Sequence, residues 1–200
     1  MNSIQRRWLG WRHGVKFAKR GHGCEFPVPR LTIEGHVEIG DLIRFRDNVT
    51  LRTYGDGRIV MGSRGGFSWN CLVEAENLVQ IGNRCGIAEN TVISDRVWNL
   101  FGNADAREEA GRRGEPVIIE DECFVGSGCF IGPGAHIGFG GVLAHHSVLT
   151  RAMGPYEIWG GAPARRIAHR TQNVPDKIRE EVERLIAEQG IQPDRNEGSY

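Results

Sequence analysis

The sequence has no excess of charge of either sign, because 25 Lys and Arg residues balance 25 Asp and Glu residues. This balance disfavours a protein that binds nucleic acid through bulk positive charge. No apolar run approaches the roughly 20 residues of a membrane-spanning helix, and the N-terminal segment lacks the continuous apolar stretch of a secretory signal. We therefore expect a globular, cytoplasmic chain with no nucleic-acid partner.

The cysteines lack the spacing that a metal site or a disulfide framework needs. The five residues are Cys24, Cys71, Cys85, Cys123 and Cys129, with no CxxC pair and an odd total. A zinc site uses ligands paired closely in sequence, and a disulfide framework normally uses an even number of cysteines. We expect them to be reduced and to act as small apolar residues, and we expect no metal cofactor.

Glycine, by contrast, is abundant, and it belongs to a repeat. The 28 glycines are about twice the usual share of roughly 7%, and they are spread along the chain. A six-residue period runs through the sequence, in which each hexad opens with an aliphatic residue and has a small residue in fifth place. From residue 119 the openings are Ile119, Val125, Ile131, Ile137, Leu143 and Leu149, and the small residues are Cys123, Cys129, Ala135, Gly141 and Ser147.

A period of six fits neither an ordinary helix nor an ordinary strand. It predicts an all-β fold, a left-handed parallel β-helix of hexapeptide repeats in which three hexads make one triangular coil. The first residue of each hexad fills the axis, and the fifth lies inside a corner where only a small side chain fits. We assign this β-helix to residues 33–170, with an outward polar loop at about 99–116 that interrupts the hexads.

The two ends of the chain have other patterns. Residues 1–32 are an amphipathic N-terminal segment and lead-in, with a short helix that either packs on the first coil or contacts a membrane surface weakly. Residues 171–200 hold a C-terminal helix and tail, and the helix is predicted from Pro175 to Gln189. Because solenoids need terminal caps, we expect this helix to cap the open end of the β-helix.

Three stretches combine the hexads with a distinctive exit from the last coil. They are GEPVIIEDECFVGSGCFIGPGAHIG from Gly114, GGVLAHHSVLTRAMGP from Gly140 and WGGAPARRI from Trp159. With the outward loop, they resemble the hexapeptide-repeat acyltransferases, in particular the maltose and galactoside acetyltransferases and the surface-polysaccharide sugar O-acetyltransferases. The resemblance implies a homotrimer that transfers an acetyl group from acetyl-CoA to a sugar hydroxyl of a surface glycan or its precursor.

The same resemblance places the donor and the acceptor. The pantetheine arm of CoA would lie along coil edges and bond to exposed backbone groups, and the CoA phosphates would meet basic residues near the exit. The cofactor-binding residues implied are Ser127, Ala144, Arg151, Ala162, Arg165 and Arg166. Asn70 and Glu74 fall near the polar residues with which the family binds its acceptor.

One expected catalytic residue is missing from the loop. Trp98 stands where the family has its histidine, so it is assigned to the substrate contacts, and the loop from there to Pro116 contains no histidine. A hydroxyl that attacks a thioester needs a general base. The candidates are His145 and His146, since imidazole suits proton transfer near neutral pH, and Asp95 at the root of the loop, although a carboxylate is ordinarily a weak base.

Two alternatives need no base at all. A sugar amine, once deprotonated, attacks without help, so an N-acetyltransferase would only have to orient it. Alternatively, the chain has lost catalysis and serves as a trimeric β-helix scaffold. A metal-dependent β-helix of the carbonic anhydrase kind would need three histidines across a subunit interface, and the spacing of the histidines gives that reading no support.

Overall fold

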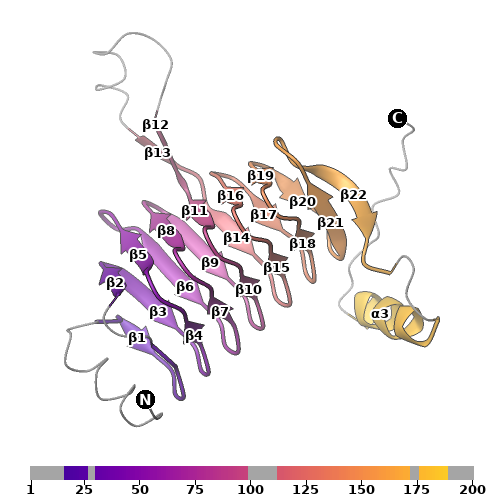
Figure 1. Ribbon diagram of the computed structural model, residues 1–200, viewed down its shortest axis with the longest axis horizontal. Helices are drawn as coiled ribbons and strands as arrows, with labels where there is room; N and C mark the ends of the chain where they lie inside the picture. The colour runs from indigo at the N-terminus through magenta and orange to yellow at the C-terminus, as the bar shows by residue number, and fades with distance from the viewer. Residues whose placement is uncertain (1–15, 27–29, 99–111, 172–175, 189–200) are drawn as a thin grey trace.

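The computed structural model describes residues 16–26, 30–98, 112–171 and 176–188, and within them the regular secondary structure is β-strand except for one C-terminal helix. Short parallel strands form three sheets, named A, B and C here, that wind around a common axis (Figure 1). Successive strands pass from sheet A to sheet B to sheet C and back to sheet A. This arrangement is the parallel β-helix that the hexads predict, so the expected fold class is confirmed.

Neighbouring coils pair in register, so that equivalent side chains form rows along the molecule. Sheet A contains β1 (Lys19–Arg20), β3 (His36–Ile39), β6 (Arg58–Met61), β9 (Leu78–Ile81), β14 (Val117–Ile119), β17 (His136–Ile137) and β20 (Ala152–Met153). Sheet B contains β4 (Arg44–Phe45), β7 (Gly66–Phe67), β10 (Gly86–Ile87), β15 (Phe124–Val125), β18 (Val142–Leu143), β21 (Glu157–Gly160) and the antiparallel β22 (Arg165–His169). Sheet C contains β2 (Leu31–Glu34), β5 (Val49–Thr53), β8 (Leu72–Ala75), β11 (Val92–Ser94), β16 (Phe130–Ile131) and β19 (Val148–Leu149).

The axis is filled as the hexads predict. The aliphatic residues that open the hexads from residue 119 onward are all completely buried. The four cysteines in fifth place are buried as well, and all five cysteines are free thiols. Their sulfurs also bond between coils: Cys71 Sγ lies 3.2 Å from Ala88 O and Cys129 Sγ lies 3.1 Å from Ala144 O. Burial raises the pKa of the Cys71 thiol to about 11, so it remains protonated and able to donate.

The N-terminal end of the coil is filled by aromatic rings. Phe26, Phe45 and Phe67 stack in sequence, with ring centroids 5.7 Å and 5.6 Å apart. Strand β1 already pairs with β3, so the β-helix begins near Lys19, earlier than the boundary at residue 33 that the hexads suggest. Residues 1–15, which include most of the predicted N-terminal helix, lie outside the described residues.

The C-terminal end is closed by the exit segment. Trp159 of β21 packs against the core, and Ala164 is 2% exposed. The exit loop bonds to β19, since Val148 N donates to Gly161 O at 2.9 Å and Ala164 N donates to Val148 O at 2.8 Å. These contacts cover the last coil.

The C-terminal helix forms, but it does not cap the coil. Helix α3 (Asp176–Glu188) stands apart from β21 and β22 in Figure 1, and Ile178 on its apolar face is 49% exposed. The expected capping role is therefore not seen, because the exit segment already buries the end of the axis. No helix within the described residues is long and apolar enough to cross a membrane.

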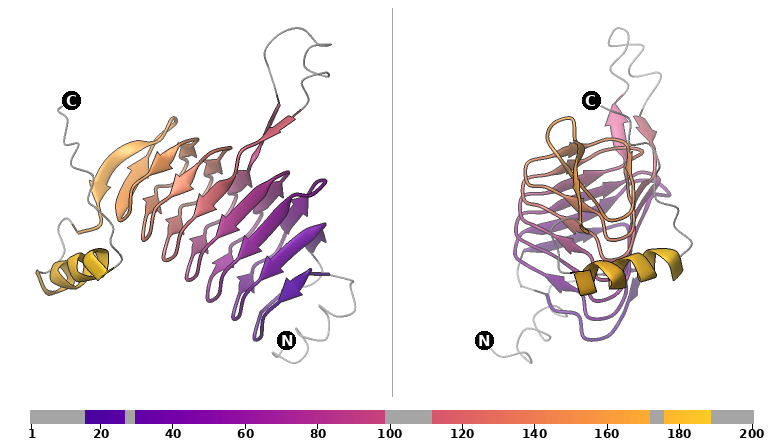
Figure 2. Two further views of the ribbon diagram at one scale, coloured as in Figure 1. Left: turned by 180° about the vertical axis from the view of Figure 1, so that it is seen from behind. Right: turned by 90° about the vertical axis from the view of Figure 1, so that its right-hand side faces the viewer.

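An antiparallel ribbon leaves the coil where the outward loop was expected. Strands β12 (Arg96–Trp98) and β13 (Arg112–Gly114) pair with each other and project from the corner between sheets C and A, as both views in Figure 2 show. Residues 99–111 between them lie outside the described residues. The ribbon starts directly after Asp95, which makes this corner its root.

Candidate functional site

A pocket of about 300 Å³ lies at the C-terminal end of sheet C. It forms where the exit loop returns over β19 and leads into β22. Gly161 has a φ of +96°, in the region that favours glycine, and this lets the chain reverse beside β19. The lining residues are Val148, Thr150, Arg151, Pro163, Ala164 and Arg165. Two of the arginines expected to bind the cofactor thus meet in one pocket.

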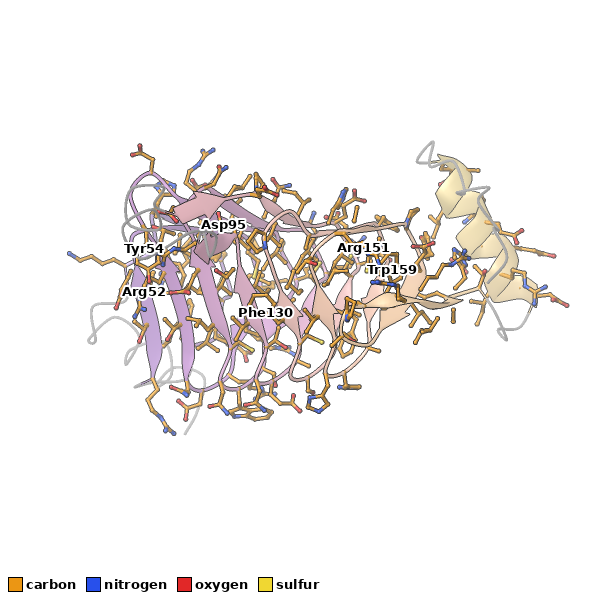
Figure 3. All side chains as sticks on the ribbon, turned by 90° about the horizontal axis from the view of Figure 1, so that it is seen from above. Arg52, Tyr54, Asp95, Phe130, Arg151 and Trp159 are labelled. Carbon is orange, nitrogen blue, oxygen red and sulfur yellow. The ribbon has the colours of Figure 1, made fainter. Side chains whose placement is uncertain are left out.

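Both pocket arginines keep their charge available. The Arg151 guanidinium lies 5.5 Å from the ring centroid of Trp159, a neutral partner, and the two side chains adjoin in Figure 3. Arg165 donates to the backbone oxygen of Ala164 at 2.9 Å. Among the residues that the structure describes, neither guanidinium has a carboxylate within 4.0 Å, whereas Arg166 does. Two uncompensated guanidinium groups at one opening favour a phosphate-bearing ligand.

Arg166, the third expected cofactor arginine, has a different role. Its Nε lies 3.2 Å from a carboxylate oxygen of Glu157, which is a buried residue. The other oxygen of Glu157 accepts from Gly154 N at 2.7 Å and from Trp159 Nε1 at 2.8 Å. Arg166 therefore offsets a buried charge in the end of the coil. Ala162 is exposed in the exit loop, next to the pocket but outside its lining.

The backbone of Ser127 and Ala144 is already hydrogen-bonded within the protein. Ser127 N donates to His145 Nδ1 at 2.9 Å, and Ser127 O accepts from His146 N at 2.8 Å. Ala144 N donates to Trp159 O at 2.8 Å, and Ala144 O accepts from the hydroxyl of Ser147 at 2.7 Å. Neither residue offers pantetheine an unpaired backbone donor, in contrast to the exposed backbone groups that the resemblance implies there.

The two histidines at this corner are exposed, but the geometry of His145 does not suit a base. Because His145 Nδ1 accepts the hydrogen bond from Ser127 N, the ring proton of the neutral imidazole lies on Nε2. The outward nitrogen is then a donor. His146 has a φ of +56°, and its ring lies over Gly128, where an added Cβ would come within 2.5 Å of Nδ1.

Asp95 has the surroundings of a structural carboxylate. It is completely buried, and its oxygens accept from the backbone nitrogens of Glu76 at 2.8 Å, Asn77 at 2.7 Å and Leu78 at 2.7 Å. A carboxylate that holds three backbone donors and is out of contact with water is not accessible to the proton of a substrate. This geometry favours a role in fixing the turn below the ribbon.

The expected acceptor contacts lie at different corners, away from the pocket. Asn70 lies between sheets B and C, in a ladder of amide side chains. Glu74 lies near the other edge of sheet C, where it accepts from the Tyr54 hydroxyl at 2.7 Å and lies 3.7 Å from Arg96. Trp98 is paired through its backbone with Arg112, and its side chain lies outside the described residues.

Glu74 belongs to a group that the sequence analysis missed. The guanidinium of Arg96 lies 3.4 Å from the ring centroid of Tyr54 and 3.3 Å from a carboxylate oxygen of Glu76. Arg52 pairs with Glu34 and lies 3.8 Å from Glu74. We call Glu34, Arg52, Tyr54, Glu74, Glu76 and Arg96 the root cluster. Pairing the coils of sheet C in register would have revealed this cluster from the sequence, since that register places Arg52 beside Glu74.

No protein-family profile matches the sequence, and no curated protein matches it significantly. Solved structures do match. AntD, an N-acyltransferase from Bacillus cereus in complex with dTDP and 3-hydroxybutyryl-CoA, superposes with a TM-score of 0.72 at 17% identity, over 95% of this chain and 97% of that chain. A galactoside acetyltransferase in complex with coenzyme A superposes with a TM-score of 0.54 at 17% identity, over 84% of this chain and 72% of that chain. The chain therefore has the β-helix fold that these acyltransferases use.

Proposed function

We propose that this protein transfers an acyl group from acyl-CoA to a sugar. The observation that supports this most directly is the pocket at the exit, where Arg151 and Arg165 have no compensating carboxylate among the described residues. CoA presents a diphosphate and a 3′-phosphate, which are matched by fixed guanidinium groups. AntD and the galactoside acetyltransferase, which share the fold, were both crystallised with CoA or an acyl-CoA.

An amino group is the acceptor that the geometry supports best. Two of the three candidates for a general base are poorly placed, since His145 Nδ1 is occupied and Asp95 holds three backbone donors. An unprotonated amine attacks the thioester carbonyl directly, the C–N bond forms as the C–S bond breaks, and the proton that the nitrogen gives up is taken by the departing CoA thiolate. One AntD structure contains dTDP-4-amino-4,6-dideoxyglucose, an amino sugar. Transfer to a hydroxyl of a surface glycan is the second candidate.

The proposal includes a homotrimer with its sites between subunits. The in-register strands of sheet C place four apolar side chains in one outward row, and Phe130 in that row is 37% exposed. The row consists of Leu72, Val92, Phe130 and Val148. Val148 also lines the pocket, so a second copy seated on this row would border the cofactor site.

Calorimetric titration with acetyl-CoA tests the cofactor site. We expect the double variant Arg151→Ala, Arg165→Ala to bind roughly 100-fold more weakly than the wild type, because two charge-assisted contacts are lost. The control is Arg58→Ala, Arg64→Ala, which removes the same charge from exposed arginines of sheet A and its corner with sheet B. Replacing CoA by 3′-dephospho-CoA should reduce the binding affinity less in the double variant than in the wild type.

Release of free CoA thiol in the presence of amino sugars and of neutral sugars then tests the reaction. We expect turnover with an amino sugar. Turnover with neutral sugars alone would instead favour a hydroxyl group as the acceptor. A wild type that does not bind acetyl-CoA at millimolar concentration would overturn the acyltransferase and leave a non-catalytic scaffold.

A further inference from the structure

The corner between sheets B and C presents an exposed tryptophan beside a ladder of amides. Trp69, which is 49% exposed, lies in the turn between β7 and β8. Asn48 Nδ2 donates to Asn70 Oδ1 at 2.9 Å, and Asn70 Nδ2 donates to Asn90 Oδ1 at 3.1 Å. All three asparagines are exposed, and each amide nitrogen has a second hydrogen, so the ladder offers donors to solvent.

The backbone conformation alone does not explain these asparagines. They lie in the left-handed region, which asparagine tolerates better than most residues. The equivalent turn between sheets A and B has the same conformation, yet it uses leucine and arginine. The φ values are 61°, 58° and 58° for Asn48, Asn70 and Asn90, against 57°, 62° and 55° for Leu42, Arg64 and Arg84. The turn therefore accepts several side chains, and the amides point to a use beyond the turn.

The tryptophan ring is held in place on one side. The guanidinium of Arg46 lies 5.3 Å from the ring centroid of Trp69, a distance at which the cation is attracted to the ring face. A ring that is already ordered loses little conformational entropy when a ligand stacks on it. Trp69 thus has the properties of a preformed aromatic platform.

Carboxylates stand on both sides of this platform. Asp47 and Glu89 occupy the place of Trp69 in the turns of the two neighbouring coils, and Asp47 pairs with Arg30. Glu89 accepts from the hydroxyl of Ser127 at 2.9 Å. Hydrogen bonds from its own backbone and from Ser127 lower the pKa of Glu89, so this carboxylate is ionised near neutral pH. Arg30 and Arg46 balance the charges of Asp47 and Glu89, so the surface has no net charge that would select an anion, and the carboxylates provide acceptors for hydroxyl groups.

We propose that Trp69, with the asparagine ladder and Glu89, binds the pyranose rings of a neutral glycan. The apolar C–H face of a pyranose stacks on an aromatic ring, while its hydroxyls are both donors and acceptors and match amides and carboxylates. The ladder crosses neighbouring coils about 4.8 Å apart, which suits a chain of sugars. Strand β16 separates β11, which follows the last turn of the ladder, from β19, so this surface is distinct from the exit pocket and does not depend on acyl transfer.

An array of immobilised neutral and anionic oligosaccharides, probed with the full-length protein without CoA, tests this surface. Saturation-transfer NMR then measures affinity for the neutral oligosaccharides that are bound. We expect Trp69→Ala to weaken binding at least about tenfold and Trp69→Phe to stay within about threefold of wild type, because stacking needs only the ring. The matched control is Leu42→Ala, which removes an apolar side chain of the same 49% exposure from another corner.

Several results would overturn the proposal. They are binding to anionic glycans only, no binding to any neutral glycan at millimolar concentration, and equal binding by wild type and Trp69→Ala. A change of molecular mass in light scattering for Trp69→Ala would instead make Trp69 an interface residue and also overturn it. Since the assay contains no CoA, failure of the acyltransferase proposal would leave a positive result here intact.

Discussion

Two groups of arginines lie toward opposite ends of sheet C, and their surroundings differ. Figure 3 shows Arg52, Tyr54 and Asp95 gathered near one end and Arg151 beside Trp159 toward the other. In the root cluster, both guanidinium groups face carboxylates. In the exit pocket, Arg151 faces a ring and Arg165 a backbone oxygen. The same side chain thus serves the fold in one place and is left available to a ligand in the other.

The two groups differ in whether removal of a guanidinium would deprive a carboxylate of its ion-pair partner. Arg96 has only 9% of its side chain exposed, and its loss would remove the guanidinium from the partly buried carboxylate of Glu76 and leave Glu74 with only Tyr54 and Arg52. Loss of Arg151 or Arg165 leaves no unpaired carboxylate among the described residues. Removal of an arginine should therefore lower stability at the root of the ribbon, whereas at the exit it should lower the affinity for an anion.

The strongest test of this contrast is Arg96→Ala. We expect it to lower the free energy of unfolding by about 2–3 kcal/mol, below the range for a fully buried pair because Glu76 is partly exposed. Urea denaturation measures this loss, and acetyl-CoA affinity of the folded variant should equal that of wild type. The Arg151→Ala, Arg165→Ala variant should show the reverse pattern, with stability within about 1 kcal/mol of wild type. An Arg96→Ala variant as stable as wild type would abolish the distinction.

Asp95→Asn sharpens the comparison at the same root. The amide retains one acceptor oxygen but turns an N–H₂ group toward backbone donors, so we expect a loss of about 2–3 kcal/mol in unfolding free energy. Because the residue is buried as a turn anchor, the rate of the proposed acyl transfer by the folded variant should stay within about twofold of wild type. Unchanged stability with a collapse of kcat would instead identify Asp95 as the general base. Thermal denaturation and thiol release, measured on one preparation, separate the two results.

The smallest expected effect is a pH dependence at the exit. Burial, and then the charge of Arg166, lower the pKa of His169 in the folded protein. The unfolded chain then takes up a proton on this residue first as the pH falls, so its contribution reduces stability below the ordinary histidine pKa of about 6.5. His169→Gln should therefore lose less unfolding free energy than wild type between about pH 7 and pH 5. Identical pH profiles for the two proteins would show that His169 does not contribute.

The six-residue period was sufficient to predict the course of the chain. Its aliphatic openings and small fifth residues recur because every coil imposes the same steric limits on the axis and on the corners. Positions such as Cys71 and Cys129 could therefore be assigned to packing without a structure, and they are buried as expected. An excursion from the repeat and the C-terminal helix were also predicted, since each interrupts or follows the repeat with a different pattern, but the antiparallel pairing of β12 with β13 at the base of the excursion was not.

The availability of each polar group was decided only by the tertiary structure. Arg166 follows Arg165 directly, yet only Arg166 meets the carboxylate of Glu157, and Ser127 has its backbone N–H covered by His145 from the next coil. Such partners are brought together by winding the chain, over sequence separations that no local pattern records. The repeat determines where a side chain stands, because that depends on local sterics. What remains free to bind a ligand depends on charges and hydrogen bonds between coils, which only the folded molecule settles.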